Sequence, residues 1–277
     1  MTPTGVSDIP ATHIVIPDTQ CKPGVPTAHL GWIGRYIFDQ FNGKPNVTVV
    51  HLGDHWDMPS LSEYDKGTFR MEGRRVQEDI QAGNEGLAML TAPTDARIAR
   101  NRAWGNKQWN PRRVLLRGNH EFRINRYLDL NPTMRGFLSE DELLSPGWEV
   151  YPFLQPVFID GIGYAHYWAN PMTGRPIGSV AATRLKQIGH TATMGHQQVL
   201  EYAIRFVQGK SQHMLIAGAC YLHNEDYKGF QGNAHWRGIV VCFQVEDGSY
   251  DPLFISLDFL CRKYEGVRLT EYLKEAT

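Results

Sequence analysis

The chain has 277 residues, of which 42% are hydrophobic and 21% charged, and its formal net charge is −1. This composition is typical of a soluble globular protein and excludes disordered and fibrous classes. No run of about 18 apolar residues occurs, so no membrane span is expected, and residues 1–10 lack the pattern of a secretory signal. The four cysteines show no CxxC spacing, which argues against a disulfide framework or a zinc ribbon and favours a cytoplasmic protein.

The first half of the chain alternates between strand-like and helical patterns. Short apolar segments rich in β-branched residues predict strands at 12–16, 47–52 and 114–116. Apolar residues at helical spacing predict helices over 27–41, about 70–90 and near 95–104. Strands that alternate with helices are typical of a layered α/β fold.

The second half favours strands. Turn residues such as Asp160-Gly161 and Asp247-Gly248 separate strand-like segments at 157–166, 191–194, 214–217, 239–245 and 253–257. We expect these segments to form a second sheet packed on the first. Because no repeat, low-complexity tract or linker is visible, residues 1–277 are expected to form one domain, with a basic helical insertion at about 60–111.

Residues 66–126 are basic although the whole chain is nearly neutral. This stretch holds thirteen Lys and Arg residues against six Asp and Glu residues. Two interpretations follow from this excess. The stretch is either the solvated face of an Arg-rich helix or a surface beside the active site that binds a polyanion.

Five polar motifs each follow an apolar segment, where functional side chains collect in open α/β sheets. They are Asp18-Thr19-Gln20, Gly53-Asp54-His55-Trp56-Asp57, Gly118-Asn119-His120-Glu121, His166 and Gly195-His196-Gln197-Gln198. Each motif alone has a simple structural explanation as a turn or a cap. Five in succession, each supplying a carboxylate, an amide or an imidazole, predict a site for two divalent metal ions.

The order and spacing of these motifs resemble the calcineurin-like metallophosphoesterase superfamily over the segment from Asp18 to Gln198. The strings PDTQ, GDHWDMPS and GACYLHNEDY are similar to phage-encoded members. The resemblance implies a four-layer αββα sandwich and a phosphoesterase that uses a metal-activated water. A phage-encoded enzyme would act in the cytoplasm of its bacterial host.

The resemblance also implies a ligand set. One site would use Asp54, Asn119, His166 and His196. The other would use Asp18, Asp54, which bridges both ions, and two histidines, but this chain has Gln20 and Gln198 at those positions. Amide oxygens are harder and weaker ligands than imidazoles. We therefore expect two divalent ions, Mn²⁺ before Mg²⁺, Fe or Zn²⁺, with one ion weakly held; a single-metal enzyme and an inactive protein remain open.

The resemblance further implies residues that act on the substrate. His120 would be the catalytic imidazole, and Asp57 would hydrogen-bond this ring and raise its pKa. We expect the substrate to contact side chains in the same motifs and in the loop 220–236, namely His55, Arg117, Arg123, His223 and His235.

Three functions fit these motifs. The basic stretch and its aromatic neighbours Trp104, Trp109 and Phe122 favour a phosphodiesterase or nuclease that acts on DNA or RNA. The near-neutral net charge favours a phosphatase or phosphodiesterase of nucleotides or other small phosphates. The third function is non-enzymatic binding, suggested by the two glutamines. Protein Ser/Thr phosphatases are not expected, because their family carries Arg where this chain has Met58.

Overall fold

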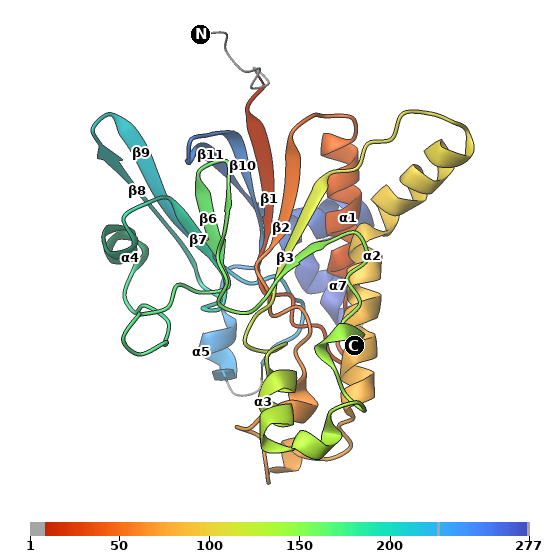
Figure 1. Cartoon of the computed structure of the whole chain (residues 1–277). Helices are drawn as coiled ribbons and strands as arrows, with labels where there is room; N and C mark the ends of the chain where they lie inside the picture. Colours follow the sequence, from red (N-terminus) through yellow and green to blue (C-terminus); the bar gives the residue numbers. More distant parts are fainter. Residues whose placement is uncertain (1–8, 226–227, 276–277) are drawn as a thin grey trace.

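The strands of the protein form two mixed sheets (Figure 1), in a computed structural model that describes residues 9–225 and 228–275. The first sheet has the order β11-β10-β1-β2-β3-β4. Its strands are β1 (Ala11–Ile16), β2 (Val47–His51), β3 (Arg112–Leu116), β4 (Glu149–Tyr151), β10 (Gly238–Glu246) and β11 (Ser249–Ser256). Strands β1 to β4 are parallel, so the carboxyl ends of these strands meet at one edge.

The second sheet has the order β5-β6-β7-β9-β8. Its strands are β5 (Val157–Ile159), β6 (Ile162–Ala165), β7 (Ala192–Met194), β8 (Leu200–Val207) and β9 (Lys210–Ala217). The central strands β6, β7 and β9 are parallel, and the two edge strands are antiparallel to their neighbours.

Alternation along the strands explains why the two sheets pack face to face. In β1, Ile14 and Ile16 join the apolar cluster under the helices, whereas Val15 joins the cluster between the sheets. In β9, Leu215 joins the cluster between the sheets, and Ile216 faces the opposite way. Successive side chains of a strand point to opposite faces, so each sheet has two buried faces.

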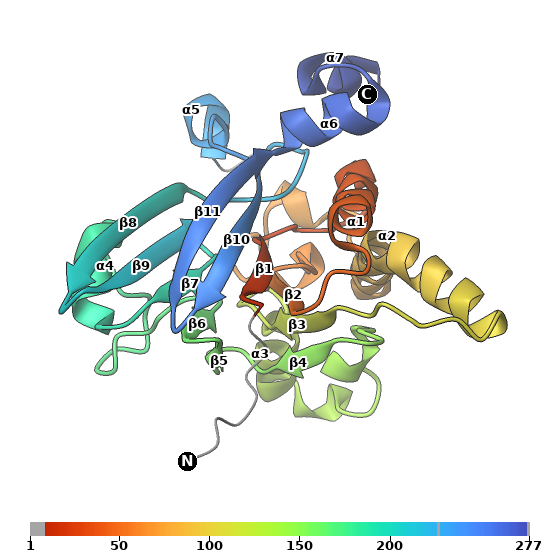
Figure 2. The ribbon, with the colours of Figure 1, turned by 90° about the horizontal axis from the view of Figure 1, so that it is seen from above.

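Helices cover both outer faces of the paired sheets (Figure 2). Helices α1 (Ala28–Phe41), α2 (Val76–Ala103) and α6 (Leu257–Glu265) pack on the first sheet, and α4 (Ala181–Ile188) packs on the second. The other helices in the described ranges are α3 (Arg123–Leu130), α5 (Gly229–Asn233) and α7 (Leu269–Glu275). No helix within these ranges is long and apolar enough to cross a membrane.

The segment 60–111 is not an insertion. Its helix α2 is the crossover between β2 and β3, and Ile80, Leu87 and Leu90 belong to the core. The sequence predicts two helices here, but α2 continues through Pro93. A proline inside a helix removes one hydrogen bond, and close packing against α1 offsets that loss. A Cβ atom on Gly34 of α1 would lie 2.3 Å from the carbonyl oxygen of Leu90.

The remaining strand predictions hold with two corrections. The segment 157–166 forms two antiparallel strands, β5 and β6, instead of one. The segments 239–245 and 253–257 do form strands, but these strands, β10 and β11, belong to the first sheet because β10 pairs with β1. The sequence analysis missed β4 and β8. Strand β8 carries a signal that the sequence analysis overlooked, because its large apolar residues Leu200, Tyr202, Ile204 and Phe206 occupy every second position.

Candidate metal centre

The loops after β1, β2, β3, β6 and β7 meet at one edge of the paired sheets. One oxygen of Asp54, one ring nitrogen of His166 and one of His196 lie within 4.8 Å of one another. The amide oxygen of Asn119 lies 2.9 Å from Nε2 of His166 and 2.8 Å from Nδ1 of His196. The structure therefore brings together the four residues that the resemblance assigns to the first ion.

Hydrogen bonds from the backbone fix these side chains. Nδ1 of His166 donates to the carbonyl oxygen of Leu52 over 2.8 Å, which leaves Nε2 facing the cluster. The backbone N–H of His120 donates to Asp54 Oδ1 over 2.9 Å. A metal-binding histidine is usually oriented by a hydrogen bond from its other nitrogen, and His166 has this arrangement.

Three ligand-type atoms therefore face one another in the cluster. They are Nε2 of His166, Oδ1 of Asn119 and Oδ1 of Asp54, which lies 3.4 Å from that nitrogen. Such atoms repel unless a cation or a proton lies among them. Burial lowers the pKa of His166, but Asp54 outweighs it and raises this pKa to about 9, so that a proton holds them together when no metal ion is bound. An imidazole with carboxylate and amide oxygens is a suitable ligand set for Mn²⁺, Fe or Zn²⁺. The residues present thus fit a divalent ion.

Two buried carboxylates belong to this edge. Asp18 and Asp54 are 0% and 1% exposed. Burial, followed by the nearby Asp54, raises the pKa of Asp18 to about 6. Burial opposes ionisation of Asp54 as well, but His120 and His166 lower its pKa below the usual range. Asp18 Oδ2 has no hydrogen-bond partner in the part of the chain that the structure describes, as expected for an oxygen that faces a cation.

Glu121 holds the loop that carries Asp54, a role that sequence reasoning missed. Its buried carboxylate accepts from the backbone N–H groups of Asp54, His55 and Trp56 over 2.6–3.1 Å, and from that of Gly118 over 2.7 Å. Asp54 itself has φ +50°, a left-handed conformation that is strained for this residue type. The carboxylate of Glu121 therefore fixes a loop that would not keep this shape alone.

The two glutamines lie at the same edge and differ in their contacts. Gln20 is 1% exposed, and neither atom of its amide has a partner among the described residues. Gln198 is also buried, but its Oε1 accepts from the hydroxyl of Tyr221 over 2.9 Å and from the ammonium of Lys228. At the second site, therefore, the amide oxygen of Gln198 is already hydrogen-bonded by other side chains, whereas the amide of Gln20 is not.

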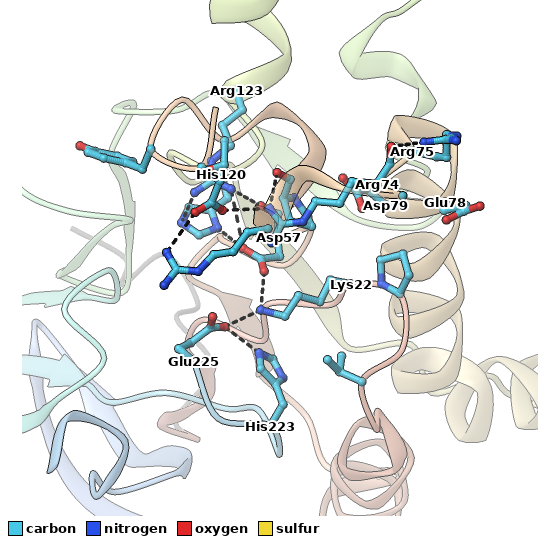
Figure 3. A pocket seen from close by; sticks show the side chains of 18 of the residues that line it. Lys22, Asp57, Arg74, Arg75, Glu78, Asp79, His120, Arg123, His223 and Glu225 are labelled. Carbon is cyan, nitrogen blue, oxygen red and sulfur yellow. Dashed lines mark hydrogen bonds and ion pairs between the residues drawn. The ribbon is translucent and has the colours of Figure 1, made fainter. Parts of the chain in front are cut away.

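A chain of charged contacts extends from the centre into the pocket (Figure 3). Nδ1 of His120 lies 2.7 Å from Asp57 Oδ1, and Asp57 Oδ2 pairs with Lys22 over 2.9 Å. Lys22 also contacts Glu225 over 2.7 Å, and Glu225 contacts Nε2 of His223 over the same distance. Sequence reasoning missed Lys22 and Glu225, because no motif signals a pair of residues that lie 203 positions apart.

These contacts tune the catalytic candidate. Burial lowers the pKa of His120, but Asp54 and the hydrogen bond that the ring donates to Asp57 outweigh it and leave this pKa above its usual value. Asp57 is buried too, yet His120, Lys22 and Arg123 lower its pKa. Asp54 and Asp57 therefore favour the protonated form of the His120 ring, against the opposing charge of Arg123.

A cavity of about 850 Å³ opens above this pair. Asn119, His120 and His196 form part of its wall, with Asp57, Lys22, His223 and Glu225 beside them. The segment before α2 and the first turn of α2 close the other side with side chains of both signs, including Arg70, Glu72, Arg74, Arg75, Glu78 and Asp79. Of the expected substrate contacts, Arg123 and His223 line the cavity.

The other three expected substrate contacts lie elsewhere, which corrects the prediction. His55 is 0% exposed, and its ring nitrogens contact Thr19 and the carbonyl oxygen of Gly83. Arg117 is buried and donates to the carbonyl oxygen of Leu143. His235 lies outside the cavity lining and contacts the carbonyl oxygen of Gly232. All three have structural contacts in place of a substrate.

The basic stretch does not form one surface beside the cavity. Helix α2 has 28 residues and is thus about 42 Å long. It begins near α3 and ends at the opposite edge of the first sheet (Figure 1), and Arg100 and Arg102 lie in its last turn. Several of the other arginines are paired with acids, namely Arg70 and Arg74 with Asp65, Arg112 with Glu149, Arg113 with Asp95 and Arg117 with Glu140. Of the two interpretations of the basic stretch, these contacts favour a solvated, ion-paired face for most of its arginines, and only Arg70, Arg74, Arg75 and Arg123 line the cavity.

The aromatic residues named with this stretch are equally dispersed. Trp104 is 79% exposed but follows the far end of α2. Trp109 donates to the carbonyl oxygen of Lys44, and Phe122 packs on Phe153 with ring centroids 5.1 Å apart. They do not form a stacking platform at the cavity.

Comparisons with known proteins give no independent assignment. No model of a known protein family matches the chain, and a search of curated proteins found no match.

Proposed function

We propose that this chain is a metal-dependent phosphoester hydrolase with the αββα fold of the calcineurin-like metallophosphoesterases. One observation carries the proposal. The ligand atoms of Asp54, His166 and His196 lie within 4.8 Å of one another, beside a hydrogen-bonded pair of His120 and Asp57 that lines a cavity. Metal ligands next to an imidazole with a raised pKa form the arrangement that phosphoester hydrolysis needs.

Each residue has a role in this proposal. Asp54, Asn119, His166 and His196 would hold a divalent ion, which supplies Lewis acidity toward a phosphoryl oxygen and lowers the pKa of water. His120, as the imidazolium, donates a proton to the leaving-group oxygen. Asp57 keeps Nδ1 of that ring protonated and turns Nε2 toward the centre.

We propose a small phosphoester as the substrate. Cavities of about 300–1,000 Å³ are typical of sites for small ligands, and this cavity has side chains of both signs. An anion would find Arg123 and Lys22 in the lining, each already tied to Asp57. A nucleic-acid substrate remains the second candidate, supported by the position of Arg70 and Arg75 at the cavity.

The test is hydrolysis of p-nitrophenyl phosphate and of bis(p-nitrophenyl) phosphate by metal-depleted protein after addition of Mn²⁺, Mg²⁺ or Zn²⁺. We expect turnover only with metal, and highest with Mn²⁺. Asp54→Asn removes a ligand charge at nearly constant volume and should lose metal and turnover together. Metal-independent or undetectable turnover by the wild-type protein would reject the proposal and favour a non-enzymatic binding role.

A further inference from the structure

The side chain of Lys228 lies against one of the residues expected to bind a second ion. Its ammonium donates to Oε1 of Gln198 and, over 3.0 Å, to the hydroxyl oxygen of Tyr221. The Tyr221 hydroxyl in turn donates to the same Oε1 over 2.9 Å. An amide oxygen has two lone pairs, and both are used here. Gln198 therefore has no lone pair left for a metal ion.

The surroundings of Lys228 are those of a cation site. Asp18 is fully buried, and the Lys228 ammonium interacts favourably with its charge. Asp18 Oδ1 accepts from the backbone N–H of His196 over 2.9 Å, so this carboxylate belongs to the loop that also carries Gln198. Asp18 Oδ2 has no hydrogen-bond partner among the described residues, so the ammonium acts on this buried carboxylate through its charge and not through a hydrogen bond.

The backbone conformation explains why His196 and Gln198, two residues apart, have different partners. His196 and Gln198 both adopt left-handed conformations, with φ +64° and +59°. Such conformations are strained for non-glycine residues and persist where the surrounding contacts fix them. Here they send His196 toward Asn119 and Gln198 toward Lys228 and Tyr221.

We propose that the Lys228 ammonium takes the position of a second cation beside Asp18 and Gln198, so that the centre binds one divalent ion. This inference rests on the proposed function, because the remaining ion is the one at Asp54, His166 and His196. It goes beyond the proposed function because it assigns the second positive charge of the centre to a lysine side chain and not to a second metal ion. A lysine ammonium is a fixed single charge, so activity should depend on a single metal-binding step.

Metal stoichiometry tests the inference without measuring activity. Native mass spectrometry after saturation with Mn²⁺ should show one ion per chain for the wild-type protein. Gln198→His alone should still bind one ion, because the ammonium remains. Gln198→His combined with Lys228→Met should bind two, because an imidazole is added and the competing charge removed. Lys186→Met, at an exposed lysine of α4, is the matched control for loss of a lysine and should leave the count at one.

Two results would overturn the inference while leaving the proposed function intact: two ions on the wild-type protein, or a single ion on the double variant. A wild-type protein that binds no Mn²⁺ would reject the metal centre and this inference together. If the double variant does not fold, anomalous scattering from a wild-type crystal soaked in Mn²⁺ decides the question. One peak at His166 and His196 supports the inference, and a second peak beside Asp18 rejects it.

Discussion

The carboxylate of Asp57 bridges His120 and Lys22, with Oδ1 2.7 Å from the imidazole Nδ1 and Oδ2 2.9 Å from the ammonium. A second link joins the ring to the basic side of the cavity, since Nε2 of His120 lies 3.1 Å from a guanidinium nitrogen of Arg123. We expect Asp57→Asn to act through His120 and not through the metal. Residues that orient a catalytic or metal-binding group typically contribute about 10–100-fold.

The predicted result for Asp57→Asn is a kcat lowered by about 10–100-fold at unchanged metal content. The direction of the pH effect follows from the contacts. The Asp57 hydrogen bond raises the pKa of His120, so its loss lowers that pKa. If the protonated ring is the acid, the alkaline limb of the pH profile of kcat/KM moves to lower pH. A profile that keeps its shape would place the acid elsewhere.

His120→Ala should show a dependence on the leaving group. A general acid contributes about 10²–10⁴-fold when the leaving oxygen needs a proton. We therefore expect kcat to fall by that factor on an alkyl phosphoester and much less on a p-nitrophenyl ester, whose leaving group is a stable anion. Mn²⁺ content, measured in parallel, should be unchanged, since His120 does not belong to the ligand cluster. Equal losses on both esters would contradict the role as an acid.

Gly118→Ala should weaken metal binding although no ligand is altered. A Cβ atom at this position would lie 2.1 Å from Oδ1 of Asp54 and 2.5 Å from its backbone nitrogen. Because backbone atoms cannot move aside cheaply in a packed interior, Asp54 must shift. We expect the Kd for Mn²⁺, measured by calorimetry, to rise at least about tenfold. Gly178→Ala is the matched control, since a Cβ there meets nothing within 4 Å; similar effects of both changes would contradict the packing argument.

The parts of the fold and site that sequence predicted are those with a local signal. Strand β2 was found because Val47, Val49 and Val50 form a short buried run, and Asp54 was found because it follows that run. The continuous helix α2 was not predicted, because a proline such as Pro93 usually ends a helix. The packing of Gly34 in α1 against Leu90 in α2 involves residues far apart in sequence, so it gives no local signal.

The missed site residues share a different cause. Lys22 and Lys228 are ordinary lysines in sequence, and their roles come from Glu225 and Gln198, which the fold brings to them. Conversely, His55 and Arg117 lie within the right motifs but point into the interior, where burial and hydrogen bonds fix them. A sequence motif predicts which loop lies near the centre, but it does not predict which side chains of that loop face the cavity.

The last prediction concerns stability and lies away from the centre. His213 of β9 is 2% exposed and stacks on Tyr250 with ring centroids 4.3 Å apart. Its ring nitrogens contact the hydroxyls of Tyr202 and Ser211. Burial lowers the pKa of His213 to about 4, whereas an unfolded histidine has a pKa of about 6.5.

Between these two values the unfolded chain binds a proton that the folded protein does not, so acidification favours unfolding. The contribution of His213 is fully present above about pH 6.5 and is lost as pH falls toward about 4, at no more than about 1.4 kcal/mol per pH unit. Urea denaturation of wild-type protein and His213→Gln at a series of pH values measures this slope. The variant should be less stable at neutral pH but lose less free energy of unfolding on acidification, and parallel curves would show that His213 already binds its proton in the folded state.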